Sequence, residues 1–343
     1  MKLAVFLAHH CAVEVAVEAE RLGVELALVP EGFRSDAPSV LGALAARTST
    51  IALAPGVMQI PARTPVLTAL TAATLDSLSG GRFRLALGVS NPDVSLGWYG
   101  VPFDRPLRRI REYVDVVRLA LRGEPVRYAG QFYRLPPDET GDPAWLRAAA
   151  TRADLPVYLA AVGPKNLALT GEIADGWIGV FNSPDGIAES LTHVAAGRAR
   201  AGRSMDGFDV LPSIPVSMHE DPERAAAPLR PYFANFIGLG SKERSIYFAV
   251  AARLGFAAAA ARIHEAVRTG DRAGAAAAVP FELIDQLSLL GDEERVAARM
   301  AEYARANVTT LGLTLLAPTA QGQLETLRGA VAARELAGRR LRS

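Results

Sequence analysis

The stretch PVYLAAVGPKNLALTGEIADGW, Pro156–Trp177, contains a strand, a turn, a helix and the start of a second strand. Its first six residues, Pro156–Ala161, form a short apolar run that is typical of a buried strand. Pro164 suits the first helical position, because its missing backbone N–H would have no partner there. We expect this helix to span Pro164–Ala174 and the next strand to span Gly176–Phe181. The stretch therefore predicts one strand–helix–strand unit of a parallel sheet.

The same alternation of strand and helix runs along most of the 343-residue chain. Helical patterns follow other predicted strands at Ala12–Leu22, Pro38–Arg47, Pro65–Leu78 and Pro106–Leu121. The eight predicted strands are Lys2–Leu7, Glu25–Val29, Thr50–Ala54, Phe83–Val89, Pro156–Ala161, Gly176–Phe181, Phe208–Val216 and Thr309–Leu316. Eight such units favour a closed α/β barrel of the (β/α)8 or TIM type over the alternative, an open doubly wound sheet.

The chain is longer than the roughly 250 residues of a plain barrel, so we predict one domain that carries insertions. One insertion, at 90–105, follows the fourth strand. A second, Gly123–Leu155, has the composition for a hairpin between Val126–Tyr128 and Phe132–Leu135. The third, Pro222–Gly291, follows the seventh strand and is largely helical in pattern.

Composition and motifs exclude several functions. With 37 Lys and Arg against 36 Asp and Glu, the net charge of +1 provides no basic surface for nucleic acid. The single cysteine, Cys11, excludes a disulfide framework, and the five histidines have no metal-binding spacing, so no metal is expected. Neither the Rossmann nor the P-loop glycine motif is present. No uninterrupted apolar run reaches the ~18 residues of a membrane span, and the N-terminus is typical of a strand and helix, so we expect a cytoplasmic protein.

In a closed barrel, ligands bind at the carboxyl ends of the strands. The third strand ends in APGVMQIP, where Gly56 predicts either a turn or a bulge pressed against a flat ligand, because glycine has no Cβ. The fourth ends in LGVSNP, where Gly88 permits close approach and Ser90 offers a hydrogen-bonding hydroxyl, although an ordinary loop is the alternative.

The loop after the fifth strand, AAVGPKN, leads directly into the helix that starts at Pro164. Free backbone N–H groups and the helix dipole favour an anion at such a helix start. Lys165 adds a positive charge, although the helix start could equally bind only water. Taken together, the three loops predict a flat cofactor that carries a phosphate.

Two titratable residues follow the first two predicted strands and are candidates for catalysis. His9 comes after the first strand and has the chemistry to relay protons, although it could be only a polar loop residue. Glu31 comes after the second strand, where it would serve either as a proton donor or as an anchor.

The same loops resemble the bacterial luciferase-like superfamily, in particular its coenzyme F420-dependent branch, which includes methylene-tetrahydromethanopterin reductase. The resemblance covers roughly residues 1–320. The matching stretches are LAPGV (Leu53–Val57), TLDSLSGGR (Thr74–Arg82), LGVS (Leu87–Ser90), VPFDRPLRRIREYV (Val101–Val114), PVYLAAVGPK (Pro156–Lys165) and LTGEIADGW (Leu169–Trp177).

The resemblance implies a deazaflavin at the strand ends, its ring lying on a bulge with a non-prolyl cis peptide at Gly56–Val57. It also implies that the loop before Pro164 holds the ribityl-phosphate end. Phe6 stands where the reductases usually carry an acidic residue, and Glu31 lies near the place of their Asp-His pair, which argues against a pterin substrate. The residues expected to bind the cofactor are Phe6, Gly56, Val57, Gly88, Val89, Ser90, Ala161, Val162, Gly163, Pro164 and Lys165.

The sequence therefore predicts an F420-dependent oxidoreductase that transfers a hydride between the deazaflavin and a small organic substrate. An FMN-dependent monooxygenase of the same superfamily is the first alternative. A non-catalytic flavin-binding barrel, with its mouth blocked by the insertions, is the second. The resemblance also implies a homodimer.

Overall fold

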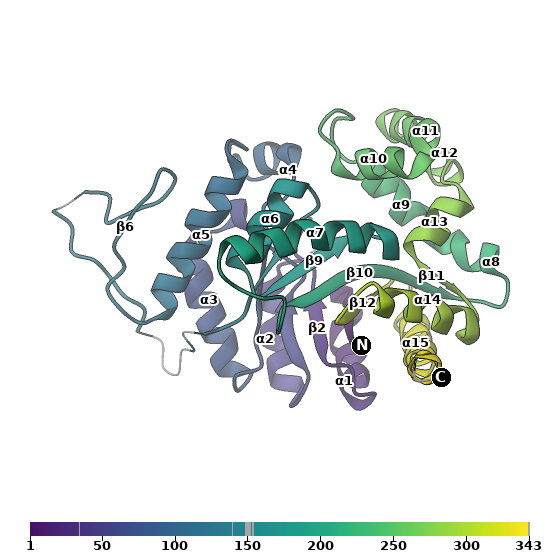
Figure 1. Ribbon diagram of the computed structural model, residues 1–343, viewed down its shortest axis with the longest axis horizontal. Helices are drawn as coiled ribbons and strands as arrows, with labels where there is room; N and C mark the ends of the chain where they lie inside the picture. Colours follow the sequence, from purple (N-terminus) through teal and green to yellow (C-terminus); the bar gives the residue numbers. More distant parts are fainter. Residues whose placement is uncertain (34, 139, 148–151, 153, 342–343) are drawn as a thin grey trace.

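The computed structural model describes residues 1–33, 35–138, 140–147, 152 and 154–341 (Figure 1). Within the predicted insertion Gly123–Leu155, residues 139, 148–151 and 153 lie outside the described residues.

In the described chain, eight parallel strand positions form a closed barrel, which confirms the predicted TIM-barrel fold. The strands are β1 (Lys2–Phe6), β2 (Leu26–Val29), β3 (Ala52–Pro55) with its continuation β4 (Met58–Gln59), β5 (Leu85–Gly88), β8 (Val157–Ala160), β9 (Gly176–Val180), β10 (Asp209–Met218) and β12 (Thr310–Leu315). Their order is β3-β2-β1-β12-β10-β9-β8-β5-β4. The backbone of Leu53 closes the ring, because its N–H bonds to the Arg82 carbonyl and its carbonyl to the Arg84 N–H, at 3.1 and 2.9 Å.

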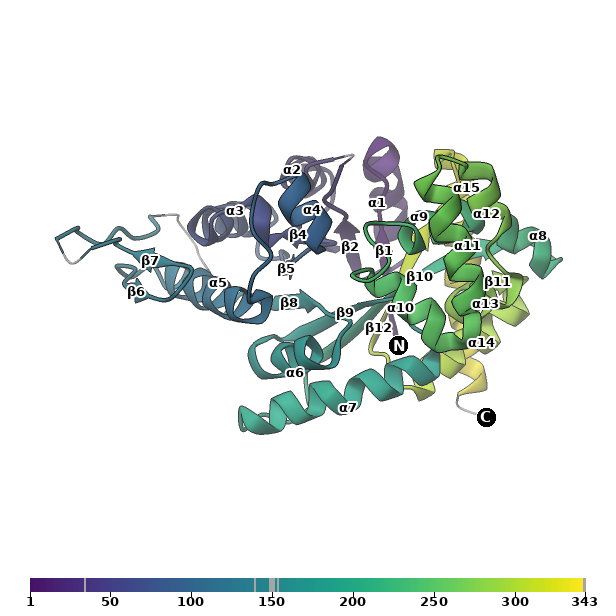
Figure 2. The same cartoon turned by 90° about the horizontal axis from the view of Figure 1, so that it is seen from above.

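Helices surround the strands, as the view from above shows (Figure 2). They are α1 (Ala12–Arg21), α2 (Ala37–Arg47), α3 (Pro65–Leu78), α5 (Pro106–Leu121), α6 (Pro164–Ile173), α7 (Pro184–Arg200), α14 (Glu293–Arg305) and α15 (Ala320–Arg340). Several start at a side chain that accepts a hydrogen bond from a first-turn N–H, for example Asp36 before α2 and Ser183 before α7. Short 3-10 turns lie at His9–Cys11 and Ile60–Ala62.

Side chains fill the inside of the barrel, so it is a packed core and not a pore. They come from alternate positions along the strands, as the two-residue repeat of a strand requires. The buried members are Ala4, Phe6, Leu26, Leu28, Ala54, Ala86, Tyr158, Ile178 and Leu211.

The three predicted insertions fold in different ways. The segment at 90–105 contains the short helix α4 (Pro92–Gly97). The predicted hairpin is present but shorter than expected, with two-residue strands β6 (Tyr128–Ala129) and β7 (Arg134–Leu135), and it projects beyond α5 (Figures 1 and 2). The carboxylate of Glu112 on α5 holds it by accepting bonds from the N–H groups of Gln131 and Phe132, at 3.0 and 2.7 Å.

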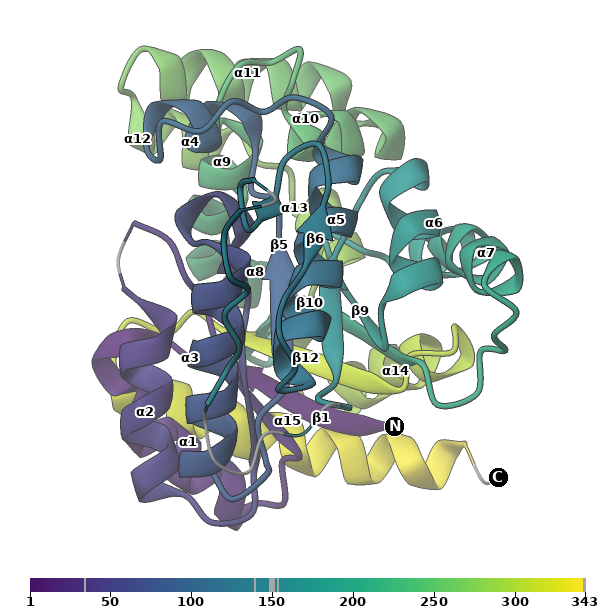
Figure 3. The ribbon, with the colours of Figure 1, turned by 90° about the vertical axis from the view of Figure 1, so that its left-hand side faces the viewer.

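The third insertion adds helices at one side of the carboxyl end of the barrel (Figure 2). They are α8 (Pro222–Ala226), a 3-10 turn (Ala227–Leu229), α9 (Arg230–Ile237), α10 (Ile246–Ala251), a π-helical turn (Ala252–Phe256), α11 (Ala257–Arg268), α12 (Arg272–Ala277) and α13 (Phe281–Leu287), followed by β11 (Leu289–Gly291), which pairs with the end of β10. In Figure 3, α4 lies beside α9, α10 and α11 at the top, with the chain termini toward the bottom. Asp93 on α4 joins the two parts, because its carboxylate accepts the Ser241 N–H at 3.0 Å and pairs with Arg244 at 2.5 Å.

One stretch of this insertion, Ile246–Arg268, is long and apolar enough to cross a membrane by length and composition, which the sequence analysis did not expect. It consists of α10 and α11 joined at Gly255, whose φ of 94° breaks the helix. Arg253 and Arg262 also interrupt its apolar character. Both helices pack against α9, and a single stretch of this kind is only weak support for a membrane span.

The carboxylate of Glu20 on α1 holds the chain that leads into β3. It accepts hydrogen bonds from the N–H groups of Ser49, Thr50 and Ile51, at 2.8, 2.5 and 2.9 Å. Burial would raise the pKa of this carboxyl, but the three backbone donors outweigh burial and lower the pKa to about 2.

We expect Glu20→Gln to lower the free energy of unfolding by about 1–2 kcal/mol at pH 7, because a charged acceptor is lost. A lowered pKa in the folded state stabilises the fold above the ordinary value of 4.5, and this contribution disappears as the pH falls toward about 2. Urea unfolding at several pH values would measure the difference between the two proteins. A difference of the same size at pH 7 and at pH 2 would contradict this role.

Candidate active site at the carboxyl ends of the strands

A backbone bulge separates β3 from β4 at the mouth of the barrel. The peptide bond Gly56–Val57 is cis, as the resemblance implied. The N–H of Gly56 donates to the Val29 carbonyl at 2.7 Å, so the bulge is bound to the end of β2. Both residues of the bulge are partly exposed, which leaves its outer surface open to a ligand.

Gly56 lets the ring of Phe6 approach the backbone closely. From the sequence, a flat ligand was expected to make this close approach. A Cβ on Gly56 would lie 2.8 Å from Cε1 of the Phe6 ring, and a Cβ on Gly312 would lie 2.7 Å from Cε2. The ring of Phe6 is therefore enclosed between two glycines in the barrel interior, with only 7% of its surface exposed. Phe6 supports the bulge from below, and its predicted contact with a cofactor stays a prediction.

Gly88, at the end of β5, makes room for the side chain of Val57. A Cβ on Gly88 would lie 2.6 Å from Cγ2 of Val57 and 3.6 Å from the Cβ of Ala160. Val57 is thereby held against the next two strands. Val89 and Ser90 follow at the rim, both partly exposed, and Ser90 has a φ of 65°, a left-handed conformation that is uncommon outside glycine.

Glu31 is part of a buried ion pair at the base of the bulge. One carboxylate oxygen pairs with Arg63 at 2.5 Å, and the other accepts the backbone N–H of Gln59 at 3.0 Å. The Glu31 side chain is only 6% exposed, and Arg63 also pairs with Asp36 at 2.7 Å. Of the two roles expected for Glu31, this arrangement favours the anchor over the proton donor, because both oxygens are already engaged in holding Gln59 and Arg63.

The predicted phosphate loop lies at the start of α6. Gly163 precedes the helix, which has no side-chain cap, and a Cβ on Gly163 would meet no atom within 4 Å. The carbonyl of Ala161 accepts a hydrogen bond from Nε1 of the buried Trp177 at 2.8 Å. This bond ties the turn to β9, while the helix start has no side-chain cap, which suits an anion.

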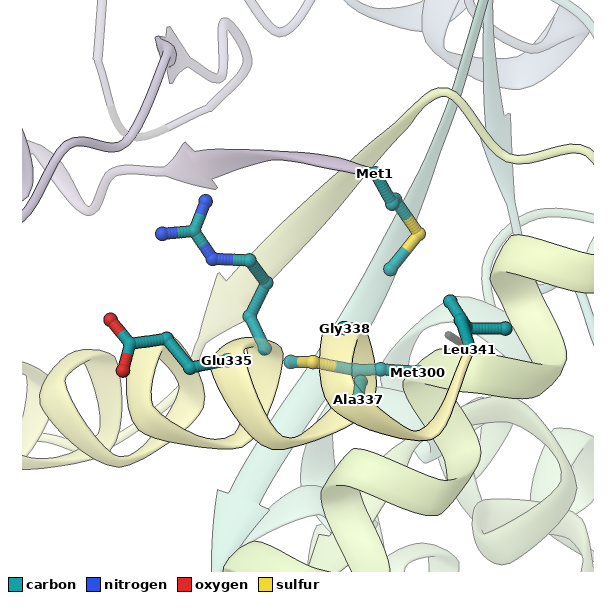
Figure 4. Close-up of a pocket in the computed structure, with 7 residues that line it drawn as sticks. Met1, Met300, Glu335, Ala337, Gly338 and Leu341 are labelled. Carbon is teal, nitrogen blue, oxygen red and sulfur yellow. The ribbon is translucent and has the colours of Figure 1, made fainter. Parts of the chain in front are cut away.

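A hollow of about 510 Å³ adjoins this turn between α5 and α6. Lys165 lines this hollow. Arg111 and Glu172 also line it and form an ion pair with 2.7 Å between nitrogen and oxygen. A second hollow, of about 340 Å³, lies next to Met1 and Leu341 at the other end of the barrel, where Figure 4 shows its lining. Only the first is therefore near the predicted phosphate loop.

Three polar side chains at the mouth were missed by the sequence analysis. Gln59 on β4, Asn166 in the first turn of α6 and Asn182 after β9 each have a buried side-chain oxygen that lacks a hydrogen-bond partner in the described chain. Buried polar atoms normally have partners, so unpartnered ones at a barrel mouth are suited to donors on a ligand. Each of the three residues lies at or shortly after the end of a strand, and this position in the sequence could have identified them as candidates for the site.

His9, the other candidate catalytic residue, lies at the mouth in the 3-10 turn after β1. It is exposed, and its ring contacts that of His10 at a centroid distance of 5.6 Å. In the described chain it makes no hydrogen bond with another predicted site residue. A catalytic role for His9 therefore remains a prediction.

A profile of the luciferase-like monooxygenase family matches residues 8–310 of the chain. A Mycobacterium tuberculosis protein named as a coenzyme F420-dependent oxidoreductase is 37% identical over 88% of this chain and 89% of its own. The 5,10-methylenetetrahydromethanopterin reductase of Archaeoglobus fulgidus is 31% identical over 79% of each chain. Among solved structures, the coenzyme F420-dependent tetrahydromethanopterin reductase from Methanopyrus kandleri superposes with a TM-score of 0.83 at 28% identity, covering 96% of this chain and 97% of that one.

Proposed function

Because the chain belongs to the luciferase-like monooxygenase family, we propose that it is an F420-dependent oxidoreductase acting at the carboxyl end of its barrel. In this proposal a hydride passes between the deazaflavin and a small organic substrate. The names of its relatives support the cofactor, since they include a coenzyme F420-dependent oxidoreductase, a coenzyme F420-dependent reductase and an F420-dependent glucose-6-phosphate dehydrogenase.

One observation carries the proposal: the bulge and the open start of α6 lie on the same rim. β4, which follows the bulge, pairs with β5, and β5 pairs with β8, which leads into α6. The bulge and the helix start are therefore separated by one strand, and the orphaned oxygens of Gln59 and Asn166 belong to these two elements. The open helix start fits an anionic tail, and the two acceptor oxygens fit N–H or O–H donors on the rest of the cofactor.

In the proposed complex, Val57 and Gly88 would back one face of the ring. The first turn of α6 and Lys165 would hold the phosphate, and the pair of Glu31 with Arg63 would keep the bulge in place. When bound, a deazaflavin supplies hydride transfer at its ring carbon 5. The chain would supply the position of the reacting groups.

The cofactor can be tested with purified protein by thermal unfolding in the presence of F420 or FMN. We expect F420 to raise the Tm, since a ligand at about 100 times its Kd stabilises the native state by about 2.7 kcal/mol. Lys165→Ala should weaken F420 binding severalfold. Lys2→Ala is the matched control, because Lys2 lies at the opposite end of β1. If FMN alone raises the Tm, and the protein with reduced FMN takes up oxygen, the monooxygenase is the better assignment. If either cofactor binds but no substrate is turned over, the protein is a non-catalytic flavin-binding barrel.

We also propose that the protein forms a homodimer through α3. Three apolar side chains on this helix, Val66, Leu67 and Leu70, are each about two-fifths or more exposed, and Leu78 at its end is 61% exposed. A helix that is apolar on its outer face is better accommodated at an interface than in water. Sedimentation should therefore give a dimer for the wild type and a monomer for Leu67→Glu combined with Leu70→Glu.

A further inference from the structure

Five aromatic rings form a cluster at the mouth that the proposed cofactor site does not use. The aromatic cluster consists of Phe181, Tyr232, Phe233, Phe236 and Tyr247. Phe181 lies at its centre, with ring centroids 5.1 Å from Phe233, 5.2 Å from Tyr247, 5.8 Å from Phe236 and 6.2 Å from Tyr232. Phe181 follows β9 with a φ of 56°, which is a rare conformation for a bulky residue.

The aromatic cluster has a closed side and an open side. Phe181 and Phe233 are buried, at 5% and 0% exposed. Tyr232, Phe236 and Tyr247 are only partly buried, and the ring of Phe236 lies 4.8 Å from each of the two tyrosine rings. These three rings therefore contact one another, and each of the three residues keeps part of its surface exposed.

Two tyrosine hydroxyls are present on the accessible side without a partner. Neither the Tyr232 nor the Tyr247 hydroxyl makes a hydrogen bond in the part of the chain that the structure describes, and neither oxygen is fully buried. The pKa of Tyr232 is raised mainly by burial and to a smaller extent by the neighbouring Tyr247. Burial alone raises the pKa of Tyr247 to about 12. Both hydroxyls are therefore neutral donors at physiological pH, and no charged side chain perturbs either of them.

The aromatic cluster lies next to the proposed cofactor site. Val162, in the predicted phosphate loop, and Leu316, after β12, both pack against the apolar core that contains the cluster. α9 and α10, which supply Tyr232, Phe236 and Tyr247, lie at the carboxyl end of the barrel (Figure 3). A molecule on this surface would therefore be within reach of a ring held on the same rim.

Resting on the proposed function, we propose that Tyr232, Phe236 and Tyr247 form the substrate site and that the substrate is a neutral, planar ring compound with a carbonyl oxygen. Aromatic side chains bind planar apolar rings by stacking. A tyrosine hydroxyl that lacks a partner is suited to donate a hydrogen bond to a carbonyl oxygen. A compound that has no carbonyl would leave the hydroxyl unpaired. Within the described residues no charged side chain acts on either tyrosine hydroxyl, so the phosphate of a sugar phosphate would lack a cation at these two groups.

Binding of coumarin, a planar neutral carbonyl compound, to the F420-loaded protein would test this. Naphthalene lacks the oxygen, and glucose 6-phosphate is polar and charged. We expect coumarin to bind most tightly of the three. Tyr232→Phe with Tyr247→Phe should weaken coumarin at least about tenfold and leave naphthalene unchanged, while Phe236→Ala should weaken both. Tyr133→Phe, between β6 and β7 on the distant hairpin, is the matched control, and F420 affinity should be the same in every variant.

Two results would overturn the substrate assignment. One is coumarin binding no more tightly than glucose 6-phosphate to the loaded wild-type protein. The other is equal coumarin affinity in the wild type and the double variant. If F420 itself fails to bind the wild type, the proposed function fails instead, so the two failures are distinguished in the same titrations. Tyrosine-to-phenylalanine changes keep the ring, so the variants keep the packing that the wild type has.

Discussion

Gly88→Ala is expected to weaken F420 binding at least about tenfold, because the added methyl group has no space at the base of the bulge. Its Cβ would lie 2.6 Å from Cγ2 of Val57, well inside van der Waals contact. Overpacking of this kind forces backbone shifts that cost about 1–3 kcal/mol. The atoms that must move belong to the cis-peptide bulge, so the surface offered to the ring of the cofactor changes. Fluorescence titration with F420 would measure the loss.

A second substitution makes the cause of that loss specific. Val57→Ala removes Cγ2, so the double variant Gly88→Ala with Val57→Ala should recover part of the lost affinity. Gly42→Ala is the control, since an added Cβ there would meet no atom within 4 Å and the residue lies in α2. It should leave F420 binding unchanged. Normal binding by Gly88→Ala alone would show that the bulge does not support the cofactor.

Glu31→Gln is expected to destabilise the fold by about 2 kcal/mol, because Arg63 and the Gln59 N–H lose a charged acceptor, although Arg63 keeps its pair with Asp36. Glu31 is 6% exposed and Arg63 is 15% exposed, so water replaces the lost interaction poorly. The affinity for F420 should fall as well, since Glu31 also holds the backbone of Gln59 in β4. Urea unfolding and F420 titration measure the two effects.

The same variant separates the two roles that the sequence left open for Glu31. An anchor affects stability and cofactor affinity, whereas a proton donor affects kcat and leaves stability near the wild-type value. The control is Glu172→Gln, which removes the more exposed pair with Arg111 and should cost no more than about 1 kcal/mol. A large loss of kcat with unchanged unfolding would return Glu31 to the catalytic residues.

The motifs that carried the family resemblance mostly have structural roles. In LTGEIADGW, Trp177 fixes the Ala161 carbonyl and Asp175 pairs with Arg118 and Arg203. A Cβ on Gly171 would lie 2.0 Å from the Val194 carbonyl oxygen, so this glycine permits α6 to pack closely on α7. The motif thereby positions the turn before α6, where the sequence predicts a phosphate.

The amino-acid sequence by itself determined the barrel, because the alternation of apolar strands with helices and the prolines and glycines at their ends act over a few neighbouring residues. Local signals also gave the helix start at Pro164 and left a turn or a bulge open at Gly56, and the family resemblance placed the bulge at Gly56–Val57. Only the tertiary structure decided that Gly56 faces Phe6, that Glu31 pairs with Arg63 and that Phe181 meets Tyr232 and Tyr247. These contacts join residues from 32 to 66 positions apart, and no local pattern encodes them, since which side chains meet depends on how the closed sheet and its covering helices bring distant segments together.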